Sequence, residues 1–103
     1  MVEDIGMSLT KPMQAISVRN VSVVMKRGRL IAVFTLSARP TRQWIAYFRE
    51  RSWYSVFDVA STRFWRDEAR IDLLRSEDME PLTAAVYRFI EEANLDARLS
   101  GCP

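Results

Sequence analysis

Residues 30–37 read Leu-Ile-Ala-Val-Phe-Thr-Leu-Ser, a run with apolar side chains at both even and odd positions. Because side chains alternate between the two faces of a strand, Ala32 and Phe34 share one face, whereas Ile31 and Val33 share the other. A strand that is apolar on both faces is typical of the interior of a sheet or of a strand that is covered twice. We therefore predict that this run is a central strand around which the other elements are arranged.

Another β-rich run, residues 15–25, lies before residues 30–37 in the chain, and the polar link Lys26-Arg27-Gly28-Arg29 separates the two runs. Two such runs around a short link that contains glycine predict a hairpin. Residues 54–59 and 69–73 are predicted as the third and fourth strands, the latter because it alternates cleanly. Residues 62–74 also fit the spacing of a helix, and between these alternatives we favour the strand.

Two helices are predicted from their N-terminal signals and their period. Thr41 is a suitable N-cap after the extended Pro40, and the helix that follows runs to about Arg51. The last helix begins near Asp78, with Ser76 as a capping residue, because Pro81 is tolerated only in a first turn. It ends near Asn94. Its apolar stripe consists of Met79, Leu82, Ala85, Val86, Phe89, Ile90 and Ala93.

The predicted order is therefore ββαββα, an α+β fold with a four-stranded antiparallel sheet and both helices packed on one face. We expect a flexible arm over residues 1–14, a single domain over residues 15–97 and a loose tail over residues 98–103. The second face of the sheet remains open. Because Ile31 and Val33 point to one side of the central strand, we expect this open face to be apolar and to form an interface.

The composition excludes several classes of protein. The 103 residues include no histidine, which excludes Ser-His-Asp catalysis and histidine-ligated metals. One cysteine, Cys102, cannot form an internal disulfide or a cysteine-only metal site. No window approaches the roughly 18 apolar residues of a membrane span, and the first residues do not resemble a signal peptide. We expect a cytoplasmic protein without cofactor or metal that is not an enzyme. The carboxylates that we considered for catalysis are explained as surface acids: Asp58, Asp67, Glu68 and Asp72.

The net charge of +2 conceals a strong segregation of charge. Residues 11–66 carry eleven basic and two acidic side chains, whereas residues 67–98 carry four basic and nine acidic ones. One interpretation is that folding brings the two regions together, so that Arg42 or Arg49 pairs with acids such as Glu91 or Glu92. A second is attraction to an acidic protein, including another copy of this chain. A third is a basic surface that binds nucleic acid or another polyanion. Its candidate residues are Arg19, Lys26, Arg27, Arg29, Arg42 and Arg49.

Eight of the eleven aromatic residues lie between positions 44 and 65 and are interleaved with arginines. We predict that Trp44, Phe48 and Phe57 belong to the core. Phe64 and Trp65 are adjacent, so on a strand they face opposite sides and at least one leaves the core. Tryptophan and arginine dominate protein-binding hot spots. The candidate partner-binding residues are therefore Arg63, Phe64, Trp65 and Arg66.

These patterns predict a small binding protein that acts through protein–protein contacts and associates with itself as a homodimer. An adaptor, an inhibitor of the immunity type and a chaperone-like protein all fit this description. The alternative is a module that binds single-stranded nucleic acid through its basic, aromatic-rich N-terminal half, because such proteins combine cations with stacking rings. The G-x-x-G loop and the RNP motif of common RNA-binding domains are absent.

Overall fold

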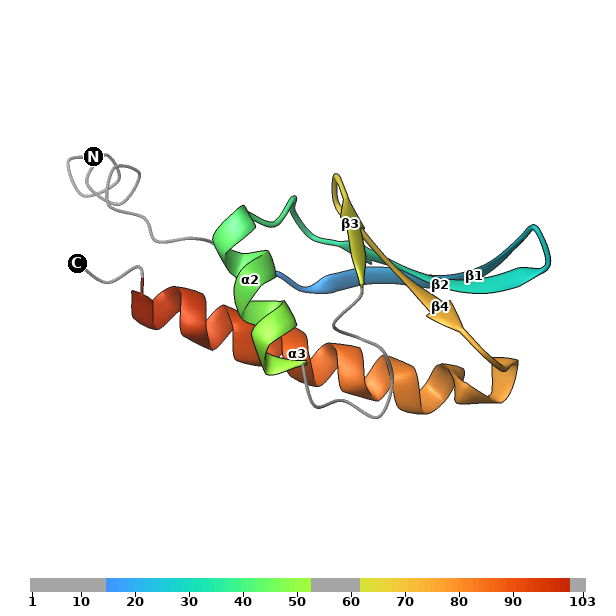
Figure 1. The fold of residues 1–103 in the computed structure, drawn as a ribbon. Coiled ribbons are helices and arrows are strands. Elements are labelled where there is room, and N and C mark those ends of the chain that lie inside the picture. Colours follow the sequence, from blue (N-terminus) through green and yellow to red (C-terminus); the bar gives the residue numbers. More distant parts are fainter. Residues whose placement is uncertain (1–14, 53–61, 101–103) are drawn as a thin grey trace.

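The computed structural model describes residues 15–52 and 62–100, which form one antiparallel sheet and two long helices (Figure 1). Along the sheet the strands are ordered β1-β2-β4-β3. The predicted α+β class, the ββαββα order and the position of residues 30–37 inside the sheet are confirmed. In chain order the elements are β1 (Val18–Lys26), β2 (Arg29–Leu36), α2 (Arg42–Arg51), β3 (Arg63–Trp65), β4 (Glu68–Leu73), the 3-10 turn η2 (Ser76–Asp78) and α3 (Met79–Ser100).

Strand β2 lies between β1 and β4, and its register separates two kinds of side chain. Phe34 pairs with Val21 of β1 and with Ala69 of β4, and these residues face the helices. Ile31 pairs with Val24 and Asp72 on the opposite face. The core therefore forms on one side of the sheet, and no helix within residues 15–52 or 62–100 covers the other side, which we call the open face. The helices and the strands contribute its large, fully buried apolar side chains: Phe34, Leu36, Trp44, Phe48, Leu82 and Val86.

The hairpin between β1 and β2 has a two-residue turn, Arg27-Gly28, whose φ angles are 53° and 76°. Two consecutive positive φ angles are typical of the turn that matches the twist of a hairpin, and glycine adopts them without steric cost. At the other end of the hairpin, Val18 pairs with Leu36 and Asn20 with Thr35, which leaves Arg19 as the extra residue of a β-bulge. The turn and the bulge thus bound the regular part of β1.

Helix α2 begins as predicted. Thr41 is extended, and its Oγ1 accepts a hydrogen bond of 3.1 Å from the backbone N–H of Trp44. Trp44 and Phe48 are four residues apart and therefore lie on the same side of the helix, where their rings stack with centroids 5.6 Å apart. Both are completely buried, as predicted from the sequence.

Helix α3 begins at Met79, within one residue of its predicted start, but its cap and its C-terminus differ from the prediction. It follows the 3-10 turn η2, whose N-cap position is Arg75 rather than the predicted Ser76 and makes no side-chain capping hydrogen bond. At its C-terminus the helix continues past the predicted end near Asn94 to Ser100, so the prediction of a loose tail from residue 98 is wrong for its first residues. The physical reason is that Ala93 and Ala97 continue the buried stripe with small side chains, which the hydropathy pattern marks only weakly.

The second hairpin is formed by β3 and β4, and residues 62–74 contain strands rather than a helix. Arg66 has a φ of 57° and reverses the chain in the turn, which a helix would not allow. The predicted strand at 54–59, the predicted core residue Phe57 and the predicted arm at 1–14 lie outside the described residues.

Asn94 connects three parts of the fold that are distant in sequence. Its Oδ1 accepts hydrogen bonds of 2.9 Å from the backbone N–H of Ile16 and from Nε1 of Trp44. Its Nδ2 donates a hydrogen bond of 2.8 Å to the carbonyl oxygen of Ile16. One side chain of α3 therefore holds α2 and the residues that lead into β1.

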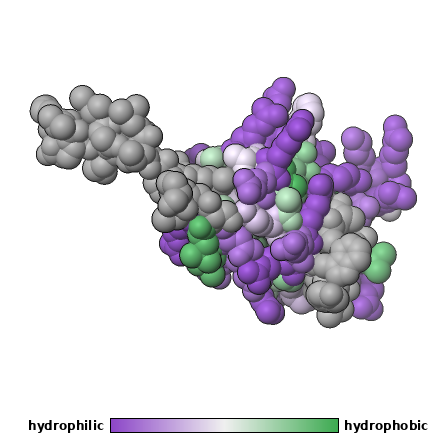
Figure 2. Space-filling model, turned by 60° about the vertical axis from the view of Figure 1, so that its left-hand side comes forward, coloured by the Kyte–Doolittle hydropathy of each residue, from purple (hydrophilic) through white to green (hydrophobic). Residues whose placement is uncertain are grey.

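Both helices lie on the same face of the sheet, and α3 extends along its length (Figure 1). In the view of Figure 2, hydrophilic side chains cover much of the described surface, and apolar residues form separate small patches. Within the described part of the chain, no helix is long and apolar enough to cross a membrane.

Candidate functional site

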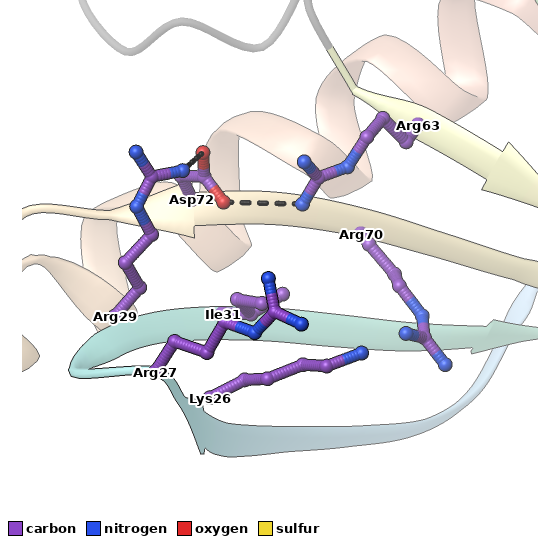
Figure 3. Close-up of a pocket in the computed structure, with 7 residues that line it drawn as sticks. All are labelled: Lys26, Arg27, Arg29, Ile31, Arg63, Arg70 and Asp72. Carbon is purple, nitrogen blue, oxygen red and sulfur yellow. Dashed lines mark hydrogen bonds and ion pairs between the residues drawn. The ribbon is translucent and has the colours of Figure 1, made fainter.

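A cleft of about 620 Å³ lies on the open face of the sheet, next to the turn between β1 and β2 (Figure 3). We call it the basic cleft. Its lining comes from the first hairpin and from both strands of the second hairpin, so segments far apart in the sequence form it. The lining residues are Lys26, Arg27, Arg29, Ile31, Arg63, Arg70 and Asp72.

The register of the sheet explains why these side chains meet. Ile31 of β2 pairs with Asp72 of β4, and Arg63 of β3 pairs with Arg70 of β4. Residues paired directly across an antiparallel ladder project to the same face, and so do residues two apart on one strand. Arg29, two positions before Ile31, therefore joins the same face. Lys26 of β1 pairs with Arg29 and joins it, so four strands place charged side chains on the side that the described helices do not cover.

The cleft is positively charged, and part of that charge is compensated within it. Asp72 lies between two arginines: its Oδ1 is 3.1 Å from Arg63 and its Oδ2 is 3.9 Å from Arg29 (Figure 3). Arg70 pairs with Glu68 at 2.8 Å. Lys26 and Arg27 make no ion pair with any residue in 15–52 or 62–100. Five cations against two carboxylates leave a net positive potential on this face.

The open face is not the apolar surface that the sequence suggests. Ile31 and Val33 are each only 7% exposed although neither described helix covers them. Long cationic side chains surround Ile31 in Figure 3, and the hydrocarbon stems of lysine and arginine can cover apolar surface while their charged ends stay in water. The prediction of an apolar open face is therefore wrong, and the face presents charge instead.

The four candidate partner-binding residues separate into two groups. Trp65 is 62% exposed and pairs with Glu68, which places it on the open face together with Arg63. The guanidinium carbon of Arg66 lies 5.3 Å from the centroid of the Trp65 ring.

Phe64, in contrast, packs edge-to-face against Trp44 and Phe48, with ring centroids 6.0 Å and 5.3 Å apart. Phe64 therefore packs against the core, because adjacent residues of a strand point to opposite faces and Trp65 points to the open face. The candidate partner surface therefore consists of Arg63, Trp65 and Arg66.

The six candidate polyanion-binding residues do not form one surface. Lys26, Arg27 and Arg29 line the basic cleft, whereas Arg19 lies at the bulge of β1 and Arg42 begins α2.

Arg49 is also on α2, which packs on the opposite face. Its Nη2 donates a hydrogen bond of 3.0 Å to the carbonyl oxygen of Thr62, and its guanidinium lies 5.8 Å from the centroid of the Phe64 ring. Arg49 thus helps to hold the start of β3 against α2.

Arg70 is the charged cleft residue that the sequence analysis did not identify, whereas Asp72 was considered for catalysis and then explained as a surface acid. Both lie in residues 67–98, where acidic side chains outnumber basic ones, so no cluster of basic residues marks Arg70 in the sequence. The available signal was the alternation of residues 69–73, which puts Arg70 and Asp72 on one face and Ala69 and Ile71 on the other.

The basic and acidic parts of the chain compensate each other only in part. The predicted pairs of Arg42 or Arg49 with Glu91 or Glu92 do not form, and Glu92 instead pairs with Arg88 of the same helix. Among the described residues, the ion pairs between the two parts join Arg29 and Arg63 to Asp72, and Arg51 to Asp96. The last of these is bidentate, with N–O distances of 2.8 and 2.7 Å, and it joins α2 to α3.

We expect Asp96→Asn to lower stability at neutral pH but not in acid. The guanidinium of Arg51 holds the pKa of the Asp96 carboxyl below its ordinary value, first through the hydrogen bond between them. A carboxyl group with a lowered folded-state pKa stabilises the fold above its unfolded pKa of about 3.9, and this contribution is lost as pH falls through the folded-state value.

Urea denaturation of both proteins at a series of pH values measures the effect. The difference between wild type and variant should be largest near pH 7 and disappear in strong acid. A difference that is independent of pH would contradict the assignment.

Within residues 15–52 and 62–100, no three histidine, cysteine or acidic side chains are grouped so that they could hold a metal ion. Comparisons with protein-family models, with curated proteins and with solved structures found no match.

Proposed function

We propose that this protein is a small binding protein whose basic cleft binds an acidic segment of a partner protein. The observation that carries the proposal is the gathering of five cations from four strands and a turn around one cleft, with Lys26 and Arg27 free of ion pairs among the described residues. Arginine binds carboxylates through two parallel hydrogen bonds, which adds geometric specificity to the attraction. Glutamate and aspartate side chains of a partner are therefore suitable ligands.

The exposed aromatic side chain of this face favours a protein over a nucleic acid. Surfaces that bind single-stranded nucleic acid stack successive bases on several aromatic rings. In the described part of the open face, Trp65 is the exposed ring. A partly exposed tryptophan beside arginines is instead typical of a protein-binding hot spot.

The test measures the affinity of the full chain for a fluorescent oligoglutamate peptide. In Lys26→Gln/Arg27→Gln, we expect binding to weaken by about tenfold or more, because each lost charge-assisted contact contributes roughly 1 kcal/mol. The matched control, Arg42→Gln/Arg98→Gln, removes the same charge from two exposed arginines on the helices. Its affinity should stay within about twofold of wild type, since the basic cleft is intact.

Equal weakening in the two double variants would show attraction by overall charge alone and would overturn the proposal. A labelled oligothymidylate of matched charge is the second probe. Tighter binding of this oligonucleotide than of the peptide, with an affinity that falls steeply with salt, would favour the nucleic-acid alternative.

A further inference from the structure

Among the residues that the structure describes, the outer edge of β1 is an unprotected strand edge. Among the described residues β1 pairs with β2 alone, so the backbone groups on its other side have no strand partner. Sheet edges are usually protected by charged residues, proline or a bulge in the middle of the strand. In β1 the bulge at Arg19 and the charge of Lys26 lie near the ends, and the segment 20–25 between them contains neither charge nor proline.

The two ends of this edge have complementary shapes. Near the hairpin turn, Val23 and Met25 are 43% and 67% exposed, although both face the helix side of the sheet. At the start of the strand, a groove of about 340 Å³ separates β1 from α3. Its apolar lining includes Ile16, Val18 and Ile90. An apolar projection at one end therefore corresponds to an apolar groove at the other.

We propose that two copies of the chain associate through antiparallel pairing of their β1 strands about a two-fold axis at Ser22. Antiparallel pairing places the start of one strand beside the end of the other, so the projection of each copy meets the groove of its partner copy. The result is one continuous sheet of eight strands, in which the unprotected edge is paired.

This register also separates like charges. With Ser22 opposite Ser22, Val21 lies opposite Val23, and Asn20 opposite Val24. Arg19 comes opposite Met25, and Lys26 opposite Val18, so no cation directly faces another. Like charges directly opposite each other destabilise a strand pair. The separation of Arg19 from Lys26 across the interface follows from the sequence of β1 itself, so it favours a second copy of this chain over an unrelated strand.

The helix side of the interface is apolar in the same register. Val21, Val23 and Met25 pair with Phe34, Ala32 and Leu30 of β2, which places all three on the side that faces the helices. The groove lined by Val18 and Ile90 lies on that side as well. Met25 of each copy therefore enters the groove of the other and removes exposed apolar surface from water.

Ser22 is exposed and central in this register, so it offers a test that leaves the fold intact. The wild-type chain should have about twice the 12.0 kDa monomer mass by sedimentation equilibrium. Ser22→Lys and Ser22→Glu should each be monomeric, because two like charges would face each other across the axis. An equimolar mixture of the two variants should recover the dimer. Ala46→Lys, an exposed position on α2, should stay dimeric as a control.

A monomeric wild type would overturn the proposal, and so would a Ser22→Lys variant that is as dimeric as wild type. A mixture that stays monomeric would overturn the two-fold register. Circular dichroism of each variant checks that the fold is retained. The proposal does not rest on the acidic partner: the mass of the unliganded chain tests the edge of β1, whereas peptide affinity tests the basic cleft.

Discussion

Phe48→Ala is expected to lower the free energy of unfolding by about 3–5 kcal/mol, the usual cost of truncating a buried phenylalanine. The Phe48 ring is 1% exposed and lies between three other rings. Its centroid is 5.6 Å from Trp44, 5.3 Å from Phe64 and 6.3 Å from Phe89. These neighbours belong to α2, β3 and α3, so the truncation opens a cavity where three elements meet and removes their aromatic contacts.

Urea denaturation followed by circular dichroism measures this loss. Since small domains have total stabilities of roughly 5–15 kcal/mol, the variant should be close to unfolding at moderate temperature. Phe48→Leu keeps much of the apolar volume and should lose clearly less. A loss below about 1 kcal/mol for the alanine variant would contradict a close-packed aromatic core at this position.

Asn94→Ala is expected to lower the free energy of unfolding by about 2–4 kcal/mol, because it removes three hydrogen bonds at once. Two of them join the backbone of Ile16 to α3, and the third satisfies Nε1 of Trp44. Trp44 is completely buried, so its indole N–H would lose its partner in a place that water does not reach. That unsatisfied donor supplies a large part of the expected cost.

The same denaturation experiment tests this prediction against two controls. Asn20→Ala removes an exposed asparagine on β1 and should change the free energy of unfolding by no more than about 0.5 kcal/mol. Trp44→Phe removes the indole donor, so it should cost less in the Asn94→Ala background than in the wild type. Equal costs of Trp44→Phe in both backgrounds would show that the hydrogen bond does not contribute to stability.

The elements that the sequence predicted correctly depend on local signals. Residues 30–37 are apolar on both faces, and this pattern alone predicts a strand inside the sheet. Thr41 after Pro40, followed by Trp44 and Phe48 four residues apart, marks the start and the buried side of α2. In each case the residues that decide the structure are neighbours in the sequence, so a periodic pattern is sufficient.

The features that the sequence did not predict depend on contacts between distant residues. Helix α3 continues past Asn94 because Ala93 and Ala97 pack in the core. Asn94 itself looked like the end of a helix, and only the fold brings it to Ile16 and Trp44.

The functional surface divides in the same way. Composition and periodicity alone establish three features: the excess of cations in residues 11–66, the charged turn from Lys26 to Arg29, and the alternation that puts Arg70 and Asp72 on one side of β4. The packing of the strands and helices brings these side chains into one cleft and lets Arg49 hold the start of β3 against α2. It also packs Phe64 against the core while Trp65 stays exposed. The physical reason is that strand periodicity sets which way each side chain points, whereas the register between strands and the placement of the helices set which side chains meet.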